Sequence, residues 1–135
     1  MDEYFAPPAG LAGEGGKPYV ILKRNQSAFE RLLVSSSMTI VRVNAGAVSS
    51  ESEFIDLMKH VLPFPEWSGS NWDIFSDIGD EIDEEWAFPV GMVVEGYSRL
   101  LKRRPQLALS VLGQLESLSS DFRRERHQFD SYYIF

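Results

Sequence analysis

Three carboxylates recur at intervals of four residues near the middle of the chain: Asp73, Asp77 and Glu81. In a helix this spacing places the side chains on one face, each a turn above the last. Like charges so placed cost an isolated helix about a few tenths of a kcal/mol per pair, so we expect the row to serve a partner outside the helix. Rigid carboxylates accept charge-assisted, often bidentate hydrogen bonds from Arg and Lys.

The row lies in the most acidic stretch of the chain. Eight acidic residues and no Lys or Arg occur between Glu66 and Glu85, whereas the remainder holds 12 acidic and 13 basic residues. Such a stretch repels phosphates and attracts basic proteins, so direct nucleic-acid binding is not expected. A solvated helix face that only aids solubility would have the same composition.

Alternating strands and helices must position this row. The helix that carries it is expected from Ser70 or Asn71 to about Ile82, with Ile74 and Ile78 on its inner face. Long helical connections between strands imply a parallel sheet with right-handed crossovers. We therefore predict an α/β fold, a small three-stranded parallel sheet flanked by helices. The expected strands are 38–43, 90–94 and 132–135, and further helices begin at a Ser50/Glu53 capping box and at Pro105.

Residues 1–37 are predicted to form an N-terminal extension to a domain at 38–135. Residues 1–16 are rich in Gly, Pro and Ala and are expected to be flexible. Residues 19–34 are expected to form a short strand and a helix that pack on the core. A Ser27/Glu30 capping box is predicted to open that helix.

The segment from Pro65 to Asp77 resembles the binding loop and second helix of the barstar family. That family has the approximate pattern P-E-aromatic-x-G-x-N-x-D-x-x-x-D. The chain matches it without a gap at Pro65, Glu66, Trp67, Gly69, Asn71, Asp73 and Asp77. The predicted order of elements from residue 38 to the end also fits the family's fold.

The resemblance implies an immunity protein or antitoxin that inhibits a ribonuclease, either barnase-like or another toxin nuclease. It further implies a monomer that forms a 1:1 complex and covers the active site, where its carboxylates take the place of substrate phosphates. By position, Asp77 corresponds to the carboxylate that enters the phosphate site, Asp73 to a supporting contact and Trp67 to the loop aromatic. The implied partner-binding residues are Trp67, Gly69, Asn71, Asp73, Ser76, Asp77, Asp80 and Glu81.

Two departures from the family leave the target nuclease open. Ser76 stands where the family often has an aromatic residue. The third helix commonly supplies another acidic contact, and here Ser117 is in register while Glu116 is one position away.

Several of these residues also have purely structural interpretations. Asp73 completes a capping arrangement with Ser70, and its charge suits a helix N-terminus. Gly69 suits a turn, and Trp67 and Trp72 could anchor the core. Asp77 lies a turn further into the helix, where capping does not explain it. The alternative function is an acidic adaptor that binds a basic protein without inhibiting a nuclease.

Other function classes fit poorly. The chain has no cysteine, which excludes disulfides and fits a cytoplasmic location, and no apolar run reaches the length of a membrane span. A calcium loop starting at Asp73 is spoiled by Phe75 and Ile78, where a ligand oxygen and a glycine are needed. No catalytic motif accompanies the two histidines. We therefore expect no metal, no cofactor and no enzymatic activity.

Overall fold

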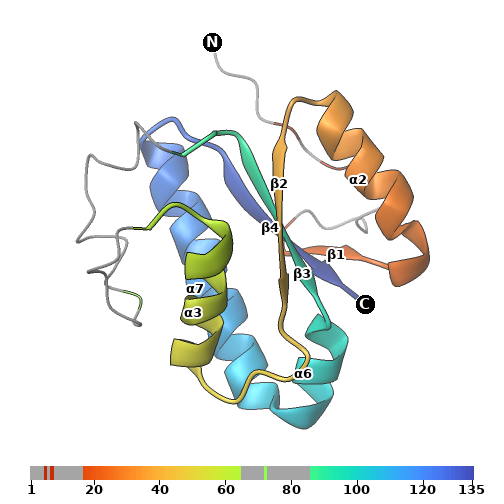
Figure 1. Cartoon of the computed structure of the whole chain (residues 1–135), viewed down its shortest axis with the longest axis vertical. Coiled ribbons are helices and arrows are strands. Elements are labelled where there is room, and N and C mark those ends of the chain that lie inside the picture. The colour runs from red at the N-terminus through yellow and green to blue at the C-terminus, as the bar shows by residue number, and fades with distance from the viewer. Residues whose placement is uncertain (1–4, 6, 8–16, 65–71, 73–85) are drawn as a thin grey trace.

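A computed structural model describes residues 5, 7, 17–64, 72 and 86–135 (Figure 1). Its sheet has the strand order β1-β4-β3-β2, and every neighbouring pair is parallel. The predicted parallel sheet is therefore confirmed. The strands are β1 (Tyr19–Ile21), β2 (Thr39–Asn44), β3 (Val90–Glu95) and β4 (Phe129–Ile134).

The prediction of three strands was wrong, because β1 joins the sheet as a fourth. It pairs with β4 in the register Tyr19↔Tyr132 to Ile21↔Ile134. All six residues of β4 are buried, so its backbone N–H and C=O groups need partners on both sides. The short β1 supplies those partners along the outer side for Tyr132 to Ile134. The strand at the C-terminus also begins at Phe129, three residues earlier than predicted.

Helices cover both faces of the sheet, with α3 and α7 on one face and α2 on the other (Figure 1). The chain runs from β1 to β2 across the sheet in one direction, and from β2 through β3 to β4 in the opposite direction. Right-handed crossovers in opposite directions place their helices on opposite faces. The helices are α2 (Gln26–Ser35), preceded by the 3-10 turn η1 (Lys23–Asn25), then α3 (Glu51–Val61), α6 (Tyr97–Arg103) and α7 (Pro105–Arg124).

The two faces bury two separate clusters. Met92 and Val94 point into the larger cluster with α3, α6 and α7, whereas Val93 points into the smaller cluster beneath α2. Tyr133 and Tyr132 divide in the same way on β4. This follows from the two-residue period of a strand. A sheet buried on both faces explains the continuous apolar run of β3.

Of the three predicted helix starts that fall within the described residues, two are confirmed. Ser50 Oγ accepts a hydrogen bond from the Glu53 backbone N at 3.2 Å, and Pro105 occupies the first turn of α7. The Ser27/Glu30 capping box was wrong. The helix α2 begins at Gln26, its N-cap makes no side-chain capping bond, and the Glu30 carboxylate binds Arg42 and Gln26 instead.

No helix in the described part of the chain has the length and apolar character needed to cross a membrane.

Candidate functional site

The eight predicted partner-binding residues all lie outside the described residues, as does the predicted helix at 70–82 apart from Trp72. They are Trp67, Gly69, Asn71, Asp73, Ser76, Asp77, Asp80 and Glu81. The structure instead describes Trp72 and the residues on either side of the acidic segment at 65–85.

The two ends of the segment meet in the larger core cluster. Phe64 precedes the segment and Trp86 follows it, and their rings pack edge to face with centroids 5.3 Å apart. Trp86 is only 6% exposed and also packs against Phe122 and Phe129, at centroid distances of 5.7 and 6.2 Å. The two residues that flank the segment therefore pack in the hydrophobic core.

Trp72 attaches the segment to the core at a second place. Its half-buried ring packs against that of Phe54 in α3, with centroids 6.3 Å apart. Its indole Nε1 donates a hydrogen bond to Glu51 Oε1 at 3.1 Å. The same oxygen accepts a hydrogen bond from Ser110 Oγ of α7 at 2.6 Å. The structural interpretation of Trp72 as a core anchor agrees with these contacts.

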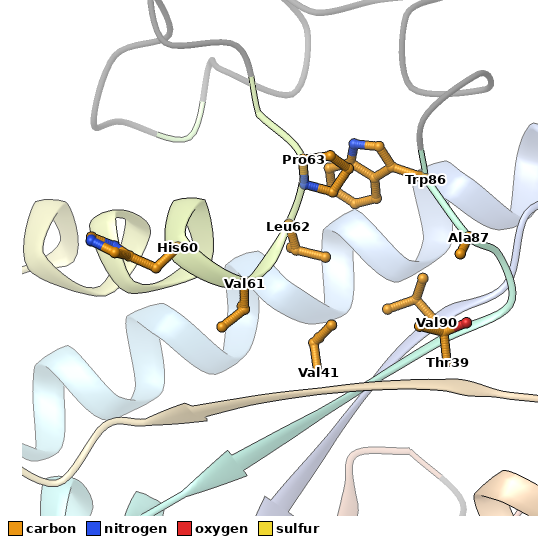
Figure 2. Close-up of a pocket in the computed structure, with 9 residues that line it drawn as sticks. All are labelled: Thr39, Val41, His60, Val61, Leu62, Pro63, Trp86, Ala87 and Val90. Atoms are coloured by element: carbon orange, nitrogen blue, oxygen red, sulfur yellow. The ribbon is translucent and has the colours of Figure 1, made fainter.

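A groove of about 380 Å³ lies beside the base of the segment (Figure 2). Apolar side chains of β2, the end of α3 and the start of β3 form most of its wall, with Trp86 at one side. The polar side chain of His60 is turned back along α3, where its Nδ1 lies 2.7 Å from the Asp56 carbonyl oxygen. Within the described ranges, no group of three or more His, Asp or Glu residues is arranged to hold a metal ion.

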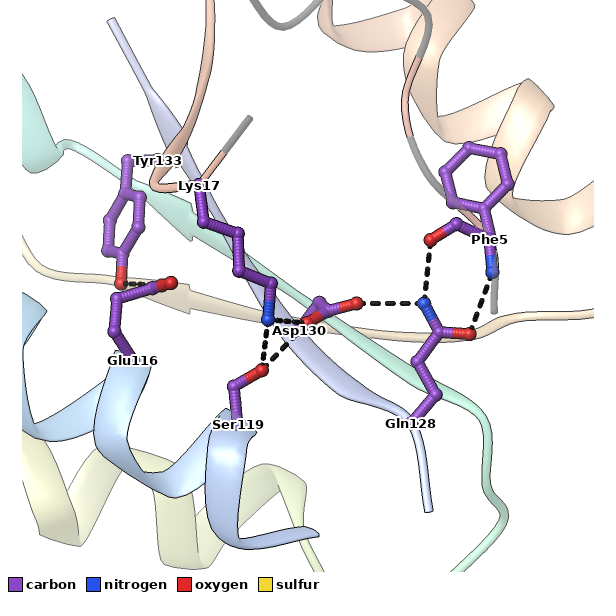
Figure 3. Close-up of polar contacts among 7 residues, drawn as sticks. All are labelled: Phe5, Lys17, Glu116, Ser119, Gln128, Asp130 and Tyr133. Carbon is purple, nitrogen blue, oxygen red and sulfur yellow. Dashed lines mark hydrogen bonds and ion pairs between the residues drawn. The ribbon is translucent and has the colours of Figure 1, made fainter. Parts of the chain in front are cut away.

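The two candidates for an additional contact on α7 have different surroundings. Glu116 is half-buried, and its Oε2 accepts a hydrogen bond from the Tyr133 hydroxyl at 2.9 Å (Figure 3). Burial raises the pKa of the Glu116 carboxyl above its ordinary value, while the Tyr133 hydrogen bond acts in the opposite direction. Ser117, in contrast, is exposed. Glu116 is therefore turned toward the sheet, and Ser117 is the more exposed of the two.

A buried polar cluster near Glu116 was not anticipated from the sequence (Figure 3). Asp130 of β4 is 0% exposed, forms an ion pair with Lys17, and accepts hydrogen bonds from Ser119 Oγ and Gln128 Nε2, both at 2.7 Å. Lys17 also donates to Ser119. Gln128 exchanges two further hydrogen bonds with the backbone of Phe5, at 3.0 and 2.8 Å. The sequence signal was an acidic residue two positions before the predicted apolar strand at 132–135, since a carboxylate requires a partner when buried.

Comparison with known protein families assigns the part of the chain that contains the acidic segment at 65–85 to a family. The family model Barstar, described as barnase inhibitor, matches residues 38–134. The chain belongs to the barstar family. No curated protein matches the chain at a significant level. The barstar match extends from the residue before β2 to the end of β4 and spans the acidic segment, whereas β1 and α2 precede it.

The resemblance inferred from the motif at 65–77 is thus confirmed at the level of the family. Membership in the barstar family indicates a barnase-inhibitor-like protein with a protein partner of the ribonuclease kind.

Proposed function

We propose that this protein is an immunity protein or antitoxin that binds a ribonuclease toxin and blocks its active site with the acidic segment. The observation that carries the proposal is the barstar match over residues 38–134, which includes the gapless motif between Pro65 and Asp77. The eight acidic residues between Glu66 and Glu85 support it, since the surface that a ribonuclease offers to RNA is basic.

The chemistry is substitution of carboxylates for phosphates. A ribonuclease holds its phosphodiester with cationic side chains, and these bind carboxylate oxygens through charge-assisted hydrogen bonds. In this proposal Asp77 enters the phosphate site, and Asp73 and Glu81 support it from the same helix face. Trp67, Gly69, Asn71 and Ser76 belong to the contact surface. Asp80 adds to the local negative potential that speeds association, an effect that is screened beyond about 8 Å at physiological ionic strength.

The complex is proposed to contain one copy of each protein in the cytoplasm, with no nucleic acid, metal or cofactor. The inhibitor itself then catalyses nothing.

The test combines binding and RNA cleavage. Barnase, and any nuclease whose gene lies beside that of this protein, are each titrated with the purified protein, and cleavage of a fluorescent RNA is followed together with calorimetric binding. Asp77→Ala is expected to weaken the complex by about 2 kcal/mol or more, the usual threshold for a hot spot. Glu85→Ala is the matched control, because it removes the same charge from the end of the same segment.

Equal losses for the two variants would contradict the proposed role of Asp77. Stoichiometric binding that leaves RNA cleavage intact would instead indicate the acidic adaptor.

A further inference from the structure

Trp72 is connected to two helices through a single carboxylate. Glu51, the first residue of α3, lies between the indole N–H of Trp72 and the hydroxyl of Ser110 in α7, and one of its oxygens accepts from both. These residues are 21 and 59 positions apart from Glu51 in the chain. We call this arrangement of Trp72, Glu51 and Ser110 the indole bracket.

We propose that the indole bracket positions the acidic segment for its partner, and that Trp72 and Glu51 are positioning residues for inhibition. This inference rests on the proposed function and deepens it. Neither residue is among the contacts that the motif implies. Their effect on binding is transmitted through the chain to the carboxylates that follow.

The position of Trp72 in the sequence allows the indole bracket to act on the carboxylates that follow it. Asp73 is the next residue and Asp77 follows five positions after Trp72. Consecutive Cα atoms are about 3.8 Å apart, so an anchor at Trp72 restricts Asp73 directly. In the helix predicted from the sequence, the five positions from Trp72 to Asp77 correspond to a rise of about 7.5 Å. Binding groups that are held in place before association lose less conformational entropy when the complex forms.

The indole bracket orients the Trp72 ring and also attaches it to the core. The tilted ring contact with Phe54 packs the indole against the core, while the indole N–H points at Glu51. A phenylalanine would keep the first of these contacts and lose the second. The hydrogen bond to an ionised acceptor is of the stronger, charge-assisted kind. Ring packing and ring orientation can therefore be separated by substitution.

The experiment measures association and dissociation rates with the ribonuclease that the wild-type protein inhibits. Trp72→Phe and Glu51→Ala are each expected to lower the affinity about tenfold, roughly the effect of one hydrogen bond to a charged group. The double variant should lose no more than the larger single loss, since both changes remove the same contact. Glu51→Gln keeps an acceptor oxygen and should retain most of the affinity.

Glu53→Ala is the matched control. It removes the same charge from the same helical turn, and it also removes the Glu53 contact with the Ser49 backbone N, but Glu53 makes no bond to Trp72 in the described structure. Affinity that is retained in Glu53→Ala but lost in Glu51→Ala, at similar unfolding temperatures, would support positioning. Wild-type affinity for Trp72→Phe, or losses that follow unfolding temperature across all variants, would overturn it.

A second measurement separates the bracket from the proposed function. In the free protein, the NMR signal of the Trp72 indole N–H should exchange slowly with solvent, and faster in Glu51→Ala but not in Glu53→Ala. If the wild-type protein binds no ribonuclease, the proposed function fails while this exchange still decides whether the bracket holds Trp72. Equal exchange in the wild-type protein and Glu51→Ala would overturn the bracket whatever the protein binds.

Discussion

Lys17 supplies the counter-charge for Asp130, a carboxylate that is completely buried in β4. The two residues belong to different parts of the sequence, because Asp130 lies inside the barstar match and Lys17 lies 21 positions before it begins. A buried carboxylate is costly unless it is paired and hydrogen-bonded. The N-terminal extension therefore completes the electrostatic environment of a residue in the family domain.

We predict that Lys17→Met lowers the free energy of unfolding by about 2 kcal/mol or more, measured by urea denaturation at pH 7. Removing one member of a buried pair leaves the other without compensation, and the cost is reduced here because the Lys17 side chain is 29% exposed. Methionine keeps the aliphatic stem and removes only the charge.

The double variant Lys17→Met with Asp130→Asn should be more stable than Lys17→Met alone, since it leaves no unpaired charge. Lys23→Met provides the control, because Lys23 is exposed in η1 and the change in net charge is the same. A cost for Lys23→Met equal to that for Lys17→Met would argue against a specific ion pair.

A second prediction concerns the cover that α2 places over the sheet. Phe29 is 0% exposed, and its ring meets that of Tyr132 edge to face at 4.8 Å. Phe29→Ala is expected to cost about 3–5 kcal/mol, the usual range for a fully buried aromatic residue. Thermal unfolding should show the loss, and binding of a hydrophobic dye should rise as the sheet face opens.

Val34→Ala on the same helix is the control, because Val34 is 64% exposed and its substitution should change stability by less than about 0.5 kcal/mol. If Phe29→Ala were equally harmless, the extension at 1–37 would be a separate attachment rather than part of the core. The domain boundary at residue 38 remains a prediction, and the comparison of Phe29→Ala with Val34→Ala tests it.

The elements that follow a simple hydrophobic period were predictable from the sequence. The helices α3 and α7 have one, the strands β2 and β3 are short apolar runs, and each of the four has a recognisable start or stop. α6 was not predicted, because it has only seven residues and its N-cap, Gly96, offers no side chain. The early start of β4 was missed because Asp130 and Ser131 are polar, and the partners that allow Asp130 to be buried come from distant parts of the chain.

The candidate site was predictable only as a motif. The spacing of Gly69, Asn71, Asp73 and Asp77 could be compared with a family pattern without knowledge of the fold. The contact between Trp72 and Glu51 could not be read in this way, since it joins residues from separate elements. Tertiary contacts of this kind leave no period or spacing in the sequence.

A third prediction concerns two glycines whose substitution by alanine should change the stability of the fold in opposite directions. Gly96 has a φ of 70°, and a Cβ atom there would lie 2.6 Å from Asn44 Oδ1 and 2.8 Å from the Gly46 backbone N. Gly96→Ala should therefore lower stability by about 2 kcal/mol or more, through the left-handed backbone and the clash.

Gly113 lies within α7, where nothing is within 4 Å of an added Cβ atom. Gly113→Ala should raise the free energy of unfolding by about 1 kcal/mol, since alanine is the better helix former. Chemical denaturation of both variants checks the pair, and stabilisation by Gly96→Ala would be incompatible with the observed turn.

The fourth prediction is a pH dependence that arises from Glu116. Burial raises the pKa of its carboxyl in the folded state above the ordinary value of 4.5. The folded protein then holds this proton more tightly than the unfolded chain does. The resulting contribution to stability is fully present below about pH 4.5 and is lost as the pH rises through the folded-state pKa.

Glu116→Gln removes this titration while keeping an oxygen that can accept from the Tyr133 hydroxyl. The variant should therefore gain stability relative to the wild-type protein as the pH rises from 4 to 7, which urea denaturation at several pH values would show.

Tyr133→Phe should move the decline in stability to higher pH, because the Tyr133 hydrogen bond lowers the pKa of Glu116. Lys17 also lowers this pKa and Asp130 raises it, so both must be intact in every variant compared. Parallel pH profiles for the wild-type protein and Glu116→Gln would mean that Glu116 is as well solvated in the folded protein as in the unfolded chain.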